Sequence, residues 1–410
     1  MVLFFRWWLF GCLVASALTS PAQTTHALPV DALGPAEPAP TVPTKDIADV
    51  ARELFPHLSS TKHDTAALRQ GHKFVSVLPA IGYALQTRFL AEAVTNVSFQ
   101  RPQANLSTIL SELIYTQNRQ GVLTIASSLW ARDNRLNWVG DWRLMHFPED
   151  TYGLGTRTAR NRPIGMNFDY LRFYQAVLRR VTRSTYVGIG YQLDYHWNIA
   201  RTDGTASTPS LGYTTGVAGR SMSAGPTLHL VFDSRANSLN PQSGLYSNVI
   251  VRSNVQFLGS DTNYQSLLLE VRKYFRFPSA SGNVLAFWSY NWLTLSGTPP
   301  YLDLPSTGWD TYGNIGRGFI QGRFRGRNLL YGEAEYRFGI THNRLLGGVV
   351  FLNAQSASEE GSHQFEKVVP AVGAGLRINV NKASGLNLAV DYGFGADGSQ
   401  GLFFNLGEVF

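Results

Sequence analysis

The amino-acid sequence predicts an all-β fold, a transmembrane antiparallel β-barrel of roughly 14 to 16 strands with sixteen favoured, after a short N-terminal linker. Three observations predict it. Apolar and polar residues alternate in segments of about ten residues over most of the chain. Charged residues make up 15% of the 410 residues, whereas aromatic residues reach 12% and glycines number 39. Beyond the N-terminus no apolar run approaches the roughly 18 residues of a membrane-spanning helix, so strands would have to cross the membrane.

Residues 1–22 have the features of a secretory signal peptide. Arg6 supplies the positive charge, an apolar stretch runs from Trp7 to Leu18, and small residues follow. Cleavage is expected after Ala22 or, as an alternative, after Ala17. A membrane anchor is disfavoured because the apolar stretch is too short to cross roughly 30 Å of hydrocarbon as a helix.

Cys12 is the only cysteine of the chain. It ends a Leu-Phe-Gly-Cys sequence, which leaves lipoprotein processing open as a second alternative. Cleavage downstream would remove the only thiol, and the mature chain could then form no disulfide. The formal net charge of +7 is scattered along the chain rather than gathered in a run, so no nucleic-acid partner is expected.

Residues 23–72 are predicted to form a periplasmic linker, because they are rich in proline and alanine. Within them Ile47, Val50 and Leu54 recur at helical spacing and Pro56 ends the pattern. This spacing predicts one short amphipathic helix. We interpret it as part of the linker, and a helix that docks a partner is the alternative.

Residues 73–410 are predicted to form the barrel. Alternation is clearest from Val187 to Trp197 and recurs from Leu386 to Phe394. A strand of this kind has lipid on one side and water on the other. A soluble β-sandwich also alternates, but here the apolar faces end in Tyr, Trp and Phe, as the aromatic girdles of a membrane barrel do.

The alternation gives fifteen strand starts, and a single-chain barrel with both ends in the periplasm needs an even number. We therefore expect one unread or wrongly split strand, before residue 130. The connections 133–164, 199–222 and 296–327 are long and alternate with short ones, which predicts extracellular loops and periplasmic turns. The starts are Phe74, Phe89, Leu106, Gly121, Met166, Tyr186, Pro226, Tyr246, Tyr264, Val284, Asn328, Leu345, Val368, Leu386 and Gly401.

Two stretches are more specific than periodicity. The first follows the pattern D-x-R-x-N-x-x-N-P-x-x-G-L-Y and predicts a tight periplasmic turn, in which the glycine can take a positive φ. Its defining residues are Asp233, Arg235, Asn237, Asn240, Pro241 and Gly244. The second is the sequence Gly-Arg-Gly-Phe at 316–319, where a long loop becomes basic and rich in glycine before the strand that starts at Asn328.

These stretches resemble the BamA/TamA family of bacterial surface-antigen barrels, which includes the two-partner-secretion transporters. The resemblance also covers the ending from Leu388 to Phe410 and is densest after residue 226. It implies an outer-membrane β-barrel, without cofactor or metal, that contacts outer-membrane lipid or lipopolysaccharide. The implied function is outer-membrane protein biogenesis or the translocation of a substrate. Client barrels or secreted proteins are the implied partners.

In this family a loop arginine pairs inside the lumen with acidic residues on the next two strands. The resemblance implies that Arg317, with Gly318 and Phe319, forms such a loop lock and that Glu335 is its first acidic partner. The second acidic position falls on Asn353, which removes one charge and implies a weaker lock. A solvated loop charge is the alternative interpretation of Arg317.

Three further residues depend on the same resemblance. Glu333 and Arg337, which flank Glu335, are expected to be lumen-wall residues that compensate each other's charge. Phe410 matches the C-terminal signal by which barrels are handed to the assembly machinery, although Glu408 stands where the family has an apolar residue.

The remaining expectations concern function. Family members that insert or secrete proteins carry POTRA modules, for which the linker is too short, so client capture is expected to need a POTRA-bearing partner. The seam between the first and last strands would open and template a client strand. A passive channel or structural barrel is the alternative. No enzyme is expected, because the sequence has no Gly-x-Ser-x-Gly elbow or metal-ligand spacing, and His196 and His229 lie on polar strand faces.

Overall fold

The computed structural model describes six segments of the chain, which are 44–54, 73–84, 87–202, 211–311, 313–382 and 385–410. The signal peptide at 1–22 and most of the linker lie outside the described residues, so the domain boundaries stay predictions. No described helix is long and apolar enough to cross a membrane.

Strands dominate the described residues. The elements are α2 (Ile47–Leu54), β1 (Phe74–Ala84), β2 (Arg88–Gln100), β3 (Leu106–Thr116), β4 (Gly121–Trp130), η1 (Arg132–Asn134), β5 (Leu136–His146), β6 (Glu149–Thr151), β7 (Ile164–Arg180), β8 (Thr185–Arg201), β9 (Gly219–Asp233), β10 (Gly244–Asn254), η3 (Gln256–Leu258), β11 (Tyr264–Arg276), β12 (Val284–Gly297), η4 (Tyr301–Asp303), β13 (Asn328–Gly339), β14 (Leu346–Ala357), β15 (Val369–Asn381), β16 (Leu386–Gly395) and β17 (Gln400–Leu406).

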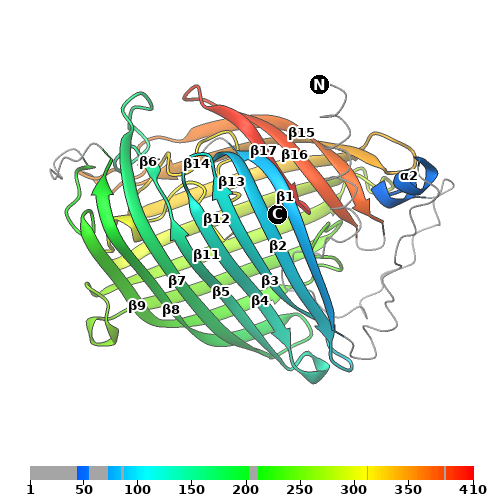
Figure 1. Cartoon of the computed structure of the whole chain (residues 1–410), viewed down its shortest axis with the longest axis horizontal. Helices are drawn as coiled ribbons and strands as arrows, with labels where there is room; N and C mark the ends of the chain where they lie inside the picture. Colours follow the sequence, from blue (N-terminus) through cyan, green and yellow to red (C-terminus); the bar gives the residue numbers. More distant parts are fainter. Residues whose placement is uncertain (1–43, 55–72, 85–86, 203–210, 312, 383–384) are drawn as a thin grey trace.

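The strands form one antiparallel sheet that curves into a barrel (Figure 1). Each strand pairs with the next, except that β5 pairs directly with β7. The three-residue strand β6 pairs only with β7, so sixteen of the seventeen strands form the wall. β1 lies beside β17, yet no ladder between them is found in the described residues. The predicted even-stranded barrel is confirmed.

The sixteenth strand was expected before residue 130, and that expectation was wrong. The missing strand is β5, Leu136–His146, which falls inside the stretch predicted to be a long loop. Its outward Trp142 and Leu144 are 39% and 49% exposed, whereas its inward Asn137 is fully buried. Gly140 interrupts the apolar row on the outer face of this segment, whereas the charged Asp141 and Arg143 lie on its inner face.

The other strand starts agree with the prediction within two residues, apart from that of β9. This strand begins at Gly219 rather than at Pro226. On the inner face, the first residues of this strand include the small, buried Ser221 and Ser223. Small side chains give no apolar signal, so the alternation becomes visible only further along the strand.

The outer face of β8 is exposed and its inner face is buried in the lumen, as the alternation predicts. Val187 and Ile189 are 48% and 68% exposed on the outer face, whereas Asp194 and His196 are 2% and 1% exposed on the inner face. A membrane barrel needs this inversion, since lipid covers the outer side chains and the interior is polar.

The predicted helix is present as α2 and lies at the periplasmic end of the barrel (Figure 1). Asp46 and Asp49 form a reciprocal cap, because each backbone N–H donates to the other's carboxylate at 3.0 and 2.9 Å. Lys382 in the β15–β16 turn lies 2.7 Å from the Asp49 carboxylate. The helix therefore docks on a turn of the barrel.

Candidate functional site

The connection between β12 and β13, residues 298–327, folds into the barrel. Three of its arginines, Arg317, Arg323 and Arg325, are only 1–2% exposed. A guanidinium group that is removed from water is costly unless carboxylates or carbonyl groups satisfy it. The partners of these arginines therefore determine how the loop is held.

Arg317 contacts three carboxylates from two strands. It forms ion pairs with Glu333 and Glu335 on β13, and its Nη1 donates to Asp391 on β16 at 2.5 Å. Its guanidinium group also lies 3.8 Å from the ring centre of Phe351. The loop is thus attached to β13 and β16.

Burial by itself disfavours the Arg317 cation. The carboxylates of Glu333 and Glu335 outweigh this effect and hold the pKa of Arg317 well above its usual range, with a further contribution from Asp391. The guanidinium group is therefore charged at any physiological pH.

The structure brings Arg317 and Glu335 together, as the resemblance implies. The other residues that contact Arg317 differ from those that the resemblance implies. The side-chain amide of Asn353 donates to the Arg317 carbonyl oxygen at 2.9 Å instead of pairing with the guanidinium group. Asp391 supplies the charge that Asn353 lacks. Sequence reasoning missed Asp391; its only sequence signal was its polar position in an alternating strand.

Glu333 and Arg337 do not compensate each other, so that expectation was wrong. Glu333 contacts Arg317 and Tyr331, whereas the Nε of Arg337 donates to Glu335 at 2.5 Å. Positions four apart on one face of a strand are separated by roughly 13 Å. Neighbours two positions apart and the buried loop arginine are closer partners.

A continuous charge network joins these groups to residues beyond β17. Arg377 on β15 donates to Asp391 at 2.5 Å and to Glu408 at 2.7 Å, and Arg337 lies 3.4 Å from Glu408. Removing one member of such a buried set leaves an uncompensated charge. The network comprises Arg317, Arg337 and Arg377 with Glu333, Glu335, Asp391 and Glu408.

The two residues after Arg317 fit the loop closely against the wall. Gly318 has a φ of 101°, and a Cβ atom there would lie 2.9 Å from the Cβ of Ala371 and 3.2 Å from the carbonyl carbon of Phe394. Only glycine permits both this φ and this approach. Phe319 is 2% exposed and packs edge-on against Phe324, with ring centres 5.3 Å apart.

Asp303 attaches the same loop to the opposite wall. Ser223 on β9 donates to its carboxylate at 2.5 Å, and Nδ1 of His196 lies 3.5 Å away. Burial, together with the neighbouring Asp194, raises the pKa of Asp303 to about 8. The Asp303 carboxyl is therefore largely protonated at neutral pH.

The other two buried arginines attach the loop to extracellular segments. The Nη2 of Arg325 donates to Glu149 on β6 at 3.0 Å, and the Nε of Arg323 donates to Asp397 in the β16–β17 connection at 2.6 Å. The loop is thus held on several sectors of the wall at once.

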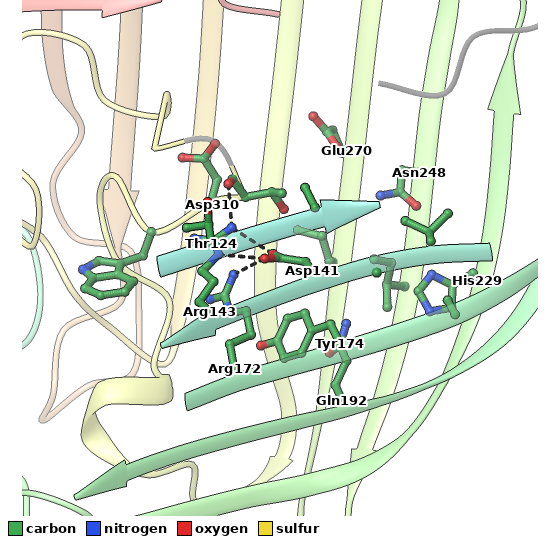
Figure 2. Close-up of a pocket in the computed structure, with 18 of the residues that line it drawn as sticks. Thr124, Asp141, Arg143, Arg172, Tyr174, Gln192, His229, Asn248, Glu270 and Asp310 are labelled. Carbon is green, nitrogen blue, oxygen red and sulfur yellow. Dashed lines mark hydrogen bonds and ion pairs between the residues drawn. The ribbon is translucent and has the colours of Figure 1, made fainter. Parts of the chain in front are cut away.

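A cavity of about 480 Å³ remains between the loop and the wall. Figure 2 shows Asp141, Arg143 and Arg172 meeting on one side, with Asn248 and Glu270 on other strands. Asp141 accepts from Arg143 at 2.8 Å and from Arg172 at 3.3 Å. Among the residues that the structure describes, no group of three or more His, Cys, Asp or Glu side chains is placed to hold a metal ion.

The periplasmic turn between β9 and β10 is rigid. Arg235 donates twice to Asp233, at 3.0 and 2.9 Å, and both side chains are almost fully buried. The side-chain oxygen of Asn237 accepts from the backbone N–H of Asn240 at 3.2 Å. Gly244 has a φ of 111°, as predicted for the end of the turn.

The same turn reaches across the periplasmic mouth. The side-chain amide of Asn240 donates to the carbonyl oxygen of Gly385 at 3.2 Å, and the backbone N–H of Glu408 donates to the carbonyl oxygen of Leu239 at 3.0 Å. β9 and β10 are the eighth and ninth of the sixteen wall strands, so they lie opposite the seam. The buried Pro241 belongs to this crossing segment.

The residues after β17 turn into the lumen. Phe410 is 2% exposed, its ring stacks on Trp288 at 5.2 Å, and its carbonyl oxygen accepts from Arg337 at 2.8 Å. Asn314 in the long loop donates to the carbonyl oxygen of Val409 at 2.8 Å. The tail 407–410 therefore contacts the periplasmic turn, the wall and the long loop.

Comparison with known proteins gives a family and two similar folds. Residues 114–410 match the model of the Omp85 superfamily domain. BamA from Haemophilus ducreyi lacking POTRA domains 1–3 is similar with a TM-score of 0.55 and 13% identity, over 82% of this chain and 70% of that chain. CdiB from Acinetobacter baumannii gives 0.53 and 11%, over 82% of this chain and 59% of that chain. At these identities the likeness concerns the fold alone, and no curated protein matches the chain.

Proposed function

The chain belongs to the Omp85 superfamily, and on this premise we propose that its barrel inserts polypeptides into the outer membrane or moves them across it. The seam supports this proposal most directly. β1 and β17 lie side by side without a ladder in the described residues. Unpaired strand edges are costly in lipid and ready to pair with another strand. A client strand could therefore add to the seam by β-augmentation.

The short last strand supports the same proposal. β17 has seven residues, whereas β7 and β8 have seventeen each. β17 pairs with β16 at seven positions, whereas β1 pairs with β2 at eleven, so β17 is the easier of the two seam strands to displace. The tail beyond β17 lies in the lumen and would move with it.

The occupied lumen favours polypeptide handling over passive conduction. The loop 298–327 crosses the interior, and the tail 407–410 and the β9–β10 turn lie at the periplasmic mouth. A passive channel needs an open path through the barrel. A plugged barrel with a weak seam can instead admit a client laterally while it stays closed to solutes.

The experiment that tests this proposal is quantitative proteomics of the outer membrane after depletion of the protein from its native host. A defined set of barrels or secreted proteins should fall, and wild-type protein should restore it. An unchanged outer-membrane proteome would reject the proposal in favour of a channel or structural role.

A seam-locked protein provides the matched control. Cysteine pairs scanned between Val75 or Val77 of β1 and Leu402 or Phe404 of β17 should yield a disulfide, and Cys12 is the only natural thiol that could interfere. The locked barrel should fail to restore the lost proteins until a reductant is added. Full restoration by the locked form would exclude seam opening as the mechanism.

A further inference from the structure

Three neighbouring periplasmic turns carry a concentration of arginine. They connect β2 to β3, β4 to β5, and β7 to β8. These turns and the adjoining end of β7 contain six arginines, here called the rim arginines, and one acidic residue, Asp133. The rim arginines are Arg101, Arg132, Arg135, Arg179, Arg180 and Arg183.

Hydrogen bonds between the turns hold the rim arginines together. Asn105 and Asn134 bond each other between the first two turns, at 2.7 and 3.1 Å. The backbone N–H of Arg180 donates to the carbonyl oxygen of Arg135 at 3.0 Å. Nη1 of Arg101 donates to the carbonyl oxygen of Trp130 at 2.9 Å. The cluster is thus built into the wall rather than carried on separate loops.

The charge of this cluster is largely uncompensated. Arg132, Arg179 and Arg183 are exposed, and in the described part of the chain they form no ion pair. The side chain of Arg135 is 80% exposed and lies 3.9 Å from Asp133, a distance at which an exposed pair contributes little. Elsewhere on the periplasmic rim Lys382 is paired with Asp49 of α2.

The position of the cluster points to the membrane rather than to the aqueous periplasm. Arg179 lies on the outer face of β7, the same face as the exposed Leu171 and Phe173. Val181, two residues further on, is 63% exposed. Arg179 pairs in register with Val187, which is also exposed outward. The arginines therefore lie at the periplasmic end of the outward apolar face, where we expect the phosphate groups of the inner leaflet.

We propose that the rim arginines bind anionic phospholipid in the inner leaflet of the outer membrane through its phosphate groups. A guanidinium group binds phosphate in a bidentate manner, and clusters of four or more basic residues beside a membrane attract anionic lipid. An acidic protein that docked from the periplasm would leave Arg179 and Val181 in contact with lipid. The site needs only the membrane topology of the barrel, so it does not depend on the proposed translocation activity.

The test compares two triple variants with equal loss of charge. Arg132→Gln/Arg179→Gln/Arg183→Gln removes half of the cluster. Its matched control is Arg160→Gln/Arg162→Gln/Arg220→Gln, which removes three exposed arginines at the extracellular end. Each full-length protein is reconstituted in vesicles of phosphatidylethanolamine and phosphatidylglycerol, extracted in mild detergent, and its retained lipids are counted by native mass spectrometry.

Wild type and the control triple should retain phosphatidylglycerol in preference to phosphatidylethanolamine, whereas the rim triple should lose roughly tenfold or more of this retention. Both vesicle leaflets have the same lipid composition. An equal loss of retained phosphatidylglycerol in the two triple variants would therefore show that net charge alone determines lipid retention, and would overturn the proposal. Unchanged retention in the rim triple would also overturn it, and would leave docking of an acidic protein as the use of the cluster. The heat-dependent gel mobility of each variant reports whether its barrel is folded.

Discussion

Arg317 and Asp391 are 74 positions apart in sequence, and they meet in the lumen because the barrel places β16 near the loop. Glu335, Asp391 and Glu408 each contact two or more arginines, and Glu333 contacts Arg317 and Tyr331. Truncating one partner of a buried ion pair costs about 3–5 kcal/mol, because the other charge is left without compensation. With Asn353 at the second acidic position of the family, Asp391 on β16 supplies a further carboxylate to Arg317.

The first prediction concerns Arg317→Ala. The barrel should stay folded while the loop loosens, since strand pairing does not involve the guanidinium group, and new protease cleavage should appear between residues 296 and 327. Arg317→Lys should give an intermediate result, because an ammonium group cannot bind three carboxylates in a fork geometry. The measurement is limited proteolysis with mapping of the cleavage sites.

The control for this prediction is Arg157→Ala, which removes an exposed ion pair with Glu366. Such surface pairs contribute about 0–1 kcal/mol, so its cleavage pattern should match wild type. Equal protease resistance of Arg317→Ala and wild type would contradict the loop lock.

At the scale of elements, the long loop is held at two places by different kinds of interaction. Arg317 fixes one part to β13 and β16 through charged groups, whereas Asp303 fixes η4 to β8 and β9 through a carboxyl group in a buried environment. The second attachment depends on pH. The folded-state pKa of Asp303 is raised to about 8, mainly by burial, from an ordinary value of 3.8.

The second prediction follows from the sign of this shift. Below about pH 4 the carboxyl is protonated in the folded and unfolded states alike, so its burial carries no ionisation penalty. Between about pH 4 and pH 8 only the unfolded state ionises, and stability falls as pH rises. The loop of wild type should therefore become more susceptible to protease from pH 5 to pH 8. In Asp303→Asn the protease susceptibility of the loop should depend less on pH. An unchanged pH profile of susceptibility in that variant would mean that another group causes the pH dependence.

The periplasmic turn gives a second example at this scale. Its Asp, Arg, Asn and Gly residues make it rigid, and rigidity allows ten residues to project across the mouth to Gly385 and Glu408. A tight turn was predicted, but its reach was not. Backbone contacts on the far side carry no side-chain signature in the sequence.

At the scale of the whole molecule, the barrel has obstructions in series. The long loop lies inside the lumen and contacts the tail 407–410 through Asn314, and the turn at 234–243 lies with that tail at the periplasmic mouth. In a series arrangement, removing one obstruction leaves the other to limit the flow of ions.

The third prediction tests that arrangement by conductance in planar bilayers. Wild type should conduct weakly, and Arg317→Ala and Asn240→Ala should each raise the mean conductance modestly. The double variant should exceed the sum of the two increases several-fold, because both obstructions are then loosened. Arg157→Ala again serves as the control. If Arg317→Ala alone matched the double variant, the periplasmic crossing would not be an obstruction.

The sequence by itself determined the all-β barrel, nearly every strand start and the helix at 47–54, and the family resemblance implied the contact of Arg317 with Glu335. These features depend on a two-residue period, on turn chemistry and on motifs, all of which are local. Where polar or small residues hid the period, as in β5 and at the start of β9, the local signal failed.

Only the tertiary structure decided which residues complete each site. Asp391, Arg377 and Glu408 join Arg317, and Phe410 lies in the lumen, because curvature of the sheet brings strands from distant parts of the chain around one interior. The rim arginines likewise become a cluster only when three turns stand side by side. Alternation states which side chains face inward or outward, whereas the partner that each one meets depends on strand register and on the curvature of the whole sheet.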